Sequence, residues 1–177
     1  MSHAANMGLL DMVKTIAALG AKDFQHALGR ALLHGDIEVA KWLQEQGAIF
    51  EPGTIMGSCE TLNERGFGFL DDAGVPLTDG KGDKLAPLAM VLETYSRHPP
   101  GKHSILQRFK ARGYQWEDTP MMAFHCGDLD ALKSHLHRDP QLIHRRFSYR
   151  EIFDWLLSQE ADVNAPAVVD NDGFGGM

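Results

Sequence analysis

Hydrophobic positions recur along the chain in a frame of thirteen residues that in most copies begins and ends with glycine. In the first copy the apolar side chains are those of Leu10, Met12, Val13 and Ile16, and a second copy repeats the spacing without a gap. This spacing follows one stripe of an amphipathic helix, and a closing glycine is typical of the left-handed residue that ends a helix. Each frame therefore predicts one helix. The frames span 8–20, 35–47, 62–74, 101–113 and 127–139.

A shorter apolar segment precedes each frame. Examples lie at 27–33, 86–92 and 119–124. Pro87 and Pro120 indicate helix starts, because proline has no amide hydrogen to lose in the first turn and its φ is already helical. Each repeating unit is therefore predicted to run helix, tight turn, helix, loop.

This pattern resembles the ankyrin repeat. The Gly-x-x-x-Val-Val-x-x-Leu-Leu-x-x-Gly-Ala second helix of that family is matched by 8–21 and 35–48, its Thr-Pro-Leu-x-x-Ala first helix in weakened form by 119–123, and its Ala-Asp-Val-Asn exit by 161–164. The resemblance covers nearly the whole chain. It implies an all-α fold, an ankyrin-type solenoid of stacked antiparallel helix pairs with short or clipped hairpin loops, over residues 1–143.

The spacing between frames departs from the family repeat of about 33 residues. Successive frames start 27, 27, 39, 26 and 21 residues apart when a sixth copy at 148–160 is included. A spacing of 27 holds two helices but no full β-hairpin, whereas 39 predicts a long helix over 85–97 and a turn at 98–101. A spacing of 21 is too short for a complete pair, so 144–164 is predicted to be an incomplete sixth repeat and 165–177 a flexible terminal loop.

Composition and charge restrict the function. The chain has 177 residues, 44% of them hydrophobic, and a net charge of −7, which is typical of a globular protein and argues against a constitutive nucleic-acid binder. The stretch 137–150 differs, because it holds four arginines against Asp139 alone. It could bind an acidic peptide or RNA, or it could be the solvated surface of an irregular linker. The N-terminus has neither a basic stretch nor an apolar signal core, so we expect a cytoplasmic protein.

Histidines and cysteines suggest no metal site. His125, Cys126, His135, His137 and His144 are close in sequence, but the side chains of His135 and His137, two apart on a helix, point about 200° apart, and no Cys-x-x-Cys is present. We expect surface or half-buried histidines, two thiols that form no disulfide, and no metal or cofactor.

No pattern typical of catalysis is present either. Ser58 and Cys59 fall where small residues pack between helices, so we expect both in the core. The acidic pairs 71–72 and 117–118 are expected on loops or exposed helix ends, where adjacent acids are usually solvated. Gly66 and Gly68 should weaken the third predicted helix by roughly 1 kcal/mol each, because glycine is a poor helix former.

The resemblance to ankyrin repeats also implies a binding face, made of the two residues before each frame glycine. Carried over by position, these residues are Asn6, Met7, Leu33, His34, Glu60, Thr61, His125 and Cys126. In the fourth frame the pair would be 99–100, inside the insertion, so nothing is carried over there. Met7, Leu33, Phe50 and Trp116 are candidate anchors, although Phe50 and Trp116 could equally seal shortened loops against the core.

We therefore predict a monomeric, non-catalytic scaffold that binds a protein partner on the concave face of the array. Two alternatives remain open. The chain could be a regulatory or targeting domain of a larger enzyme, or it could bind nucleic acid weakly through the arginines of 137–150.

Overall fold

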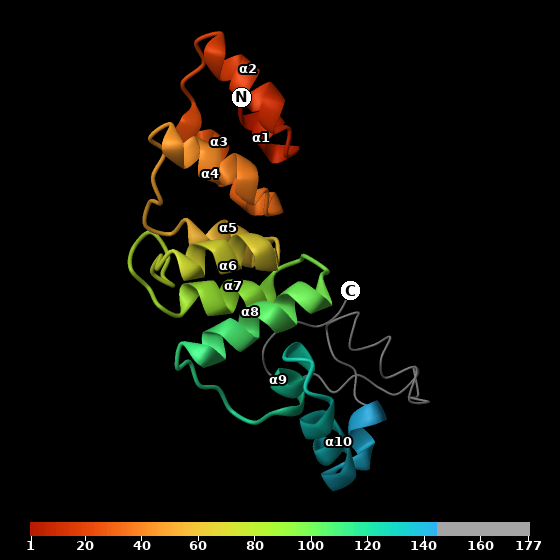
Figure 1. The fold of residues 1–177 in the computed structure, drawn as a ribbon. Coiled ribbons are helices and arrows are strands. Elements are labelled where there is room, and N and C mark those ends of the chain that lie inside the picture. Colours follow the sequence, from red (N-terminus) through yellow and green to blue (C-terminus); the bar gives the residue numbers. More distant parts are fainter. Residues whose placement is uncertain (145–177) are drawn as a thin grey trace. The chain divides into compact units, whose positions relative to one another are not determined.

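The structure is a computed structural model, and it describes residues 1–144. Over these residues it has ten α-helices, one short 3-10 helix and no strand, which confirms the all-α prediction for this part of the chain. The helices form successive pairs, shown in Figure 1. They are α1 (Ser2–Asn6) with α2 (Leu10–Ala18), α3 (Phe24–His34) with α4 (Ile37–Glu45), α5 (Ile55–Glu60) with α6 (Glu64–Asp72), α7 (Ala86–Glu93) with α8 (Pro99–Ala111), and α9 (Pro120–His125) with α10 (Leu129–Arg138), followed by η1 (Pro140–His144).

The chain divides into two compact units, Met1–Gln115 and Trp116–Met177. The array predicted over 1–143 thus falls into two units, and each is described by itself. The first unit contains pairs one to four, and the described part of the second contains pair five and η1. Apart from His144, which ends η1, the predicted sixth repeat (144–164) and terminal loop (165–177) lie outside the described residues.

In the first unit the helix pairs stack in sequence order. The first helices contact one another in the order α1, α3, α5, α7, and the second helices do so in the order α2, α4, α6, α8. The apolar stripe predicted from the frames supplies the buried side chains between the layers, including those of Val13, Leu43 and Leu70. The core is therefore a row of interfaces between neighbouring pairs.

The predicted glycine turns are present. Gly20, Gly47, Gly74 and Gly113 all have positive φ, which confirms their predicted left-handed conformation at the ends of the second helices. The first residue of the frame is also left-handed in three copies, at Gly8, Gly35 and Gly127. In pair three this place is taken by Leu62, at φ 53° and fully buried. Leucine pays about 1–2 kcal/mol for this conformation, and its burial offsets the cost.

The long helix predicted over 85–97 is wrong. Helix α7 ends at Glu93, because Thr94 adopts an extended backbone and its hydroxyl donates to the carbonyl of Glu60, 2.5 Å away. The turn predicted at 98–101 is also wrong, since Pro99 and Pro100 form the first turn of α8. The extra residues of this interval lie in the connection between α6 and α7 instead.

The two glycines of α6 have a structural use that the sequence did not reveal. Gly66 is buried, and a Cβ atom there would collide with the carbonyl oxygen of Leu32 and lie 2.7 Å from the hydroxyl oxygen of Ser58. The guanidinium of Arg108 lies over Gly68. Glycine at position 66 weakens the helix, but because it has no Cβ atom it allows α6 to approach α3 closely.

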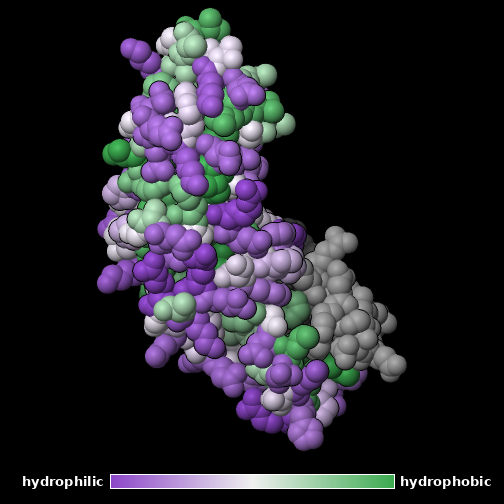
Figure 2. All heavy atoms as spheres, viewed as in Figure 1, coloured by the Kyte–Doolittle hydropathy of each residue, from purple (hydrophilic) through white to green (hydrophobic). Residues whose placement is uncertain are grey.

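The first pair exposes apolar side chains at positions that are buried in the next pair. Met12 is 51% exposed, whereas Val39, at the same place in pair two, is 1% exposed. Figure 2 shows hydrophobic spheres over α1 and α2 beside polar ones. Within residues 1–144 no helix is long and apolar enough to cross a membrane.

Candidate functional site

The residues predicted to bind a partner lie at the C-terminal ends of the first helices. Met7 is 58% exposed, His34 and Glu60 are exposed, and Asn6 and Leu33 are half-buried. Because α1, α3 and α5 contact one another in order, these ends form one continuous row. The structure thus brings together the predicted residues of pairs one, two and three.

The row continues in pair four at a place that the sequence analysis missed. His98 is the N-cap of α8, as Asp36 is of α4 and Asn63 of α6. Counting back from these caps places Tyr95 and Ser96 in the row, and not the two prolines. Tyr95 is 94% exposed. The signal was available in the paired prolines, which favour the first turn of a helix and would have moved the frame start upstream.

Backbone carbonyl groups at these helix ends tie neighbouring pairs together. The hydroxyl of Thr61 lies 2.8 Å from the carbonyl oxygen of Leu33, and the hydroxyl of Ser96 donates to the carbonyl of Glu60 at 2.7 Å. Thr61, predicted as a binding residue, is therefore half-buried and engaged in packing. The row is held in place by hydrogen bonds of its main chain, which leaves the side chains of His34 and Glu60 directed to solvent.

We define the first-helix row by its exposed side chains, Met7, His34, Glu60 and Tyr95. Helices that pack together have axes about 8–10 Å apart. Four successive first helices therefore spread these side chains over about 30 Å, which is the length of an extended peptide of about nine residues.

The predicted binding residues of pair five lie in the second unit, and one of them corrects the expectation. His125 is buried at the end of α9, so its ring is not part of an open surface, and Cys126 is half-buried. His125 is the last residue of α9, and it and Ala123 are the buried residues of this short helix.

Asp71 was expected at a solvated position, and this expectation is wrong. Its side chain is 7% exposed and lies between two arginines of α8, with Arg108 Nη1 at 2.9 Å and Arg112 Nε at 2.8 Å. Asp72 is exposed and accepts a second bond from Arg108. The bonds to Asp72 and Asp71 raise the pKa of the Arg108 guanidinium above its ordinary value. This network joins pairs three and four.

Asp118 is 73% exposed on a loop, as expected, whereas His135 was expected at or near the surface and is buried. The Nε2 of His135 lies 2.9 Å from an oxygen of Asp118, while its Nδ1 lies 2.9 Å from Arg138. Since a guanidinium can only donate, Nδ1 accepts from Arg138 and the Nε2 hydrogen points to Asp118. Of the four arginines in 137–150, Arg138 is the one within the described residues, and it is engaged in this network.

Ser58 and Cys59 are fully buried in α5, which confirms their predicted core position. Burial raises the pKa of the Cys59 thiol to about 12, so the thiolate that nucleophilic chemistry needs is suppressed. Phe50 is half-buried and packs edge-on against Phe69, with ring centroids 5.9 Å apart. This contact favours the interpretation that Phe50 seals its loop against α6.

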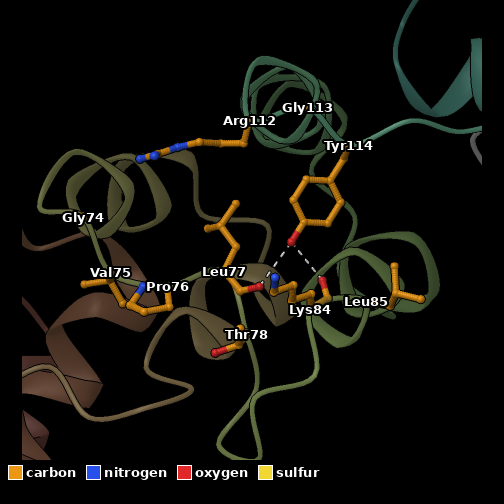
Figure 3. A pocket seen from close by; sticks show the side chains of 10 residues that line it. All are labelled: Gly74, Val75, Pro76, Leu77, Thr78, Lys84, Leu85, Arg112, Gly113 and Tyr114. Atoms are coloured by element: carbon orange, nitrogen blue, oxygen red, sulfur yellow. Dashed lines mark hydrogen bonds between the residues drawn. The ribbon is translucent and has the colours of Figure 1, made fainter.

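A pocket of about 550 Å³ lies beside the long connection between α6 and α7 (Figure 3). Its apolar lining comes from Val75, Pro76 and Leu77 on one side and from Leu85 on the other, the side on which Tyr114 lies. The remaining lining residues are Gly74, Thr78, Lys84, Arg112 and Gly113. In Figure 3 the side chain of Arg112 runs along the top of the pocket.

Tyr114 closes the loop that forms this pocket. Its hydroxyl lies 3.3 Å from the carbonyl oxygen of Leu77 and 3.0 Å from that of Lys84, the two ends of the loop (Figure 3). Partial burial and the nearby charge of Asp83 raise the pKa of Tyr114. Within the loop, Asp79 accepts bonds from two backbone amides, which lower its pKa. The pocket is therefore bordered by an ordered loop.

In residues 1–144 no group of three His, Cys, Asp or Glu side chains could hold a metal ion. Comparison with known proteins gave no match among protein-family models, curated proteins or solved structures.

Proposed function

We propose that this chain is a divergent ankyrin-type array that binds a protein partner through the first-helix row, without catalysing a reaction. The observation that carries the proposal is the row itself. The ends of four successive first helices carry exposed side chains, Met7, His34, Glu60 and Tyr95, and hydrogen bonds tie the backbone of pair two to pair three and that of pair three to pair four.

The ankyrin assignment rests on the repeat pattern and on the stacking. The frames hold one helix each, the closing glycines are left-handed, and both helix layers contact their neighbours in order. The short connections between α2 and α3 and between α4 and α5 agree with clipped hairpins. Stacked repeats of this kind provide extended surfaces for macromolecules, and a cytoplasmic partner protein is the class that we propose.

A large exposed aromatic side chain supports a protein partner. Tyrosine is enriched among the residues that dominate binding energy, because it buries a large apolar ring at low entropic cost while its hydroxyl keeps a hydrogen bond. Tyr95 is 94% exposed and lies in the short segment between α7 and α8. A ring that is 94% exposed buries little surface against the rest of the described residues, and this exposure supports a role in binding.

The test compares two triple variants in binding to a partner captured from the source cell. The row variant carries His34→Ala, Glu60→Lys and Tyr95→Ala, which change exposed side chains and leave the backbone bonds intact. We expect its affinity to fall by about tenfold to a hundredfold, as for the loss of one or two dominant contacts.

The matched control carries Glu38→Lys, Lys41→Ala and Gln107→Ala, three exposed side chains on second helices. It should bind the partner as the unchanged protein does, and circular dichroism should show that both variants are folded. Equal affinities for the row variant and the unchanged protein would refute the assignment of the surface.

A further inference from the structure

The pocket between the long connection and the end of α8 has a lining that is apolar and basic, and this lining has no part in the first-helix row. Four apolar side chains line it, and its charged lining residues are Lys84 and Arg112, with no acidic side chain among them. A pocket with apolar walls and few polar groups is the usual form of a small-ligand site.

The two cations differ in their availability. The guanidinium of Arg112 is engaged by Asp71, through Nε at 2.8 Å from the carboxylate and Nη2 at 2.8 Å from the backbone carbonyl. Lys84 has no ion pair with any residue of 1–144, and in Figure 3 it lies below the hydroxyl of Tyr114. The nearest acid in sequence, Asp83, is outside the lining, and its Oδ1 accepts from the amide of Leu85.

The loop around the pocket is fixed before a ligand arrives. Tyr114 holds both of its ends, Asp79 orders its interior, and Gly80 lies against Gly53, where an added Cβ would be 2.6 Å from the amide nitrogen of Gly80. A preformed wall lowers the entropic cost of binding. This loop occupies the interval that is twelve residues longer than the two before it, 39 against 27.

We propose that this pocket binds a small apolar carboxylate. The carboxylate pairs with the ammonium of Lys84, and the apolar body packs against Leu77 and Leu85. The volume of about 550 Å³ suits a ligand of one or two amino-acid residues. Such a group could be a free carboxylic acid or the C-terminal residue of a peptide. The proposal does not depend on the function of the first-helix row.

Titration of the ¹⁵N-labelled full chain with N-acetyl-L-leucine and with its uncharged amide tests the proposal. We expect the acid to shift the amide signals of residues 74–78, 84–85 and 113–114, and to bind about fivefold more tightly than the amide, as one partly exposed charge pair allows. Two tetrapeptides ending in leucine, one with a free carboxylate and one amidated, distinguish the two sources. Preference for the free-carboxylate peptide assigns a peptide C-terminus, and binding of the acid but neither peptide assigns a small molecule.

Two variants and a control locate the site. Lys84→Gln should bring the acid and the amide to equal affinity, and Leu85→Asp, at a 66% exposed position, should abolish binding of both without unfolding the chain. Lys81→Gln, which removes an exposed lysine of the same loop outside the lining, should leave the fivefold preference unchanged. Equal affinities for acid and amide in the unchanged protein, or signal shifts elsewhere, would overturn the proposal.

Discussion

The interface between pairs two and three and the interface between pairs three and four hold the same stack by different means. The first depends on close approach. Gly66 of α6 lies against the carbonyl of Leu32, and the hydroxyls of Ser58 and Thr61 point to the carbonyls of Leu32 and Leu33. Little space separates the backbones there, so the interface has no room for a larger side chain.

The second interface depends on charge and aromatic packing. Asp71 lies between Arg108 and Arg112, and the rings of Phe67 and Phe109 pack with centroids 5.4 Å apart. The two arginine side chains are 36% and 50% exposed, so they can adjust and solvent reaches them. The comparison shows that one repeat geometry accepts either a steric or an electrostatic solution, and that the two should respond differently to mutation and to salt.

The largest effect should come from the close approach. Gly66→Ala places a Cβ atom against backbone and a buried hydroxyl, so we expect the free energy of unfolding to fall by about 2–3 kcal/mol, measured by urea denaturation. The control is Gly29→Ala on α3, whose Cβ would meet nothing within 4 Å. That change should be neutral or stabilise by up to about 1 kcal/mol. A neutral Gly66→Ala would mean that the interface is looser than described.

The ion pairs should have a smaller effect that depends on salt. Asp71→Asn keeps the shape and removes the charge, so we expect a loss of about 1.5–3 kcal/mol at low ionic strength. The loss should shrink in about 1 M salt, because the arginines are partly exposed and are screened, whereas the loss from Gly66→Ala should not change. Asp72→Asn, at an exposed position, should cost less than about 0.5 kcal/mol. If the stability lost in Asp71→Asn were the same at low and high salt, Asp71 would act through its shape and hydrogen bonds and not through its charge.

The hydrogen bond of Thr61 should rank third. Thr61→Val removes the hydroxyl that lies 2.8 Å from the Leu33 carbonyl and keeps the volume, so we expect a loss of about 1 kcal/mol. Thr15→Val serves as the comparison, because that hydroxyl bonds to its own helix at an exposed position. If both variants lose the same stability, the bond between pairs contributes nothing specific.

The smallest effect should be at Gly68, two residues from the most sensitive position. A Cβ there would approach the tip of Arg108, at 3.0 Å, and a flexible side chain can move where a backbone carbonyl cannot. Gly68→Ala should therefore lie within about 0.5 kcal/mol of the unchanged protein, the gain in helix propensity offsetting the displaced arginine. Thermal unfolding of the two alanine variants side by side gives the contrast directly.

Local features of the fold could be predicted from the sequence. The helix in each frame depends on apolar spacing and on a closing glycine within thirteen residues, and both were correct in the first two pairs. The end of α7 could not be found in this way, because it depends on the carbonyl of Glu60, which bonds to Thr94 from 34 positions away.

The candidate site shows the same limit. The row in pairs one to three follows from the frame, whereas Tyr95 was missed because the fourth frame was started at Gly101, inside α8. The burial of Asp71 depends on Arg108 and Arg112, which are 37 and 41 positions away. The extra length of this interval was assigned to a helix over 85–97 and not to the connection between α6 and α7, so the pocket beside that connection was not anticipated.

Because of where the two cysteines lie, the separation of neighbouring helix pairs can be measured as a rate of thiol labelling. Cys59 lies in pair three with no exposed surface and a pKa of about 12, and Cys126 lies in the second unit, half-buried. A thiol-specific reagent can reach Cys59 only when pair three separates from its neighbours, so its rate of labelling counts those separations. The labelling rate of Cys59 thus reports opening in the first unit, and that of Cys126 reports opening in the second.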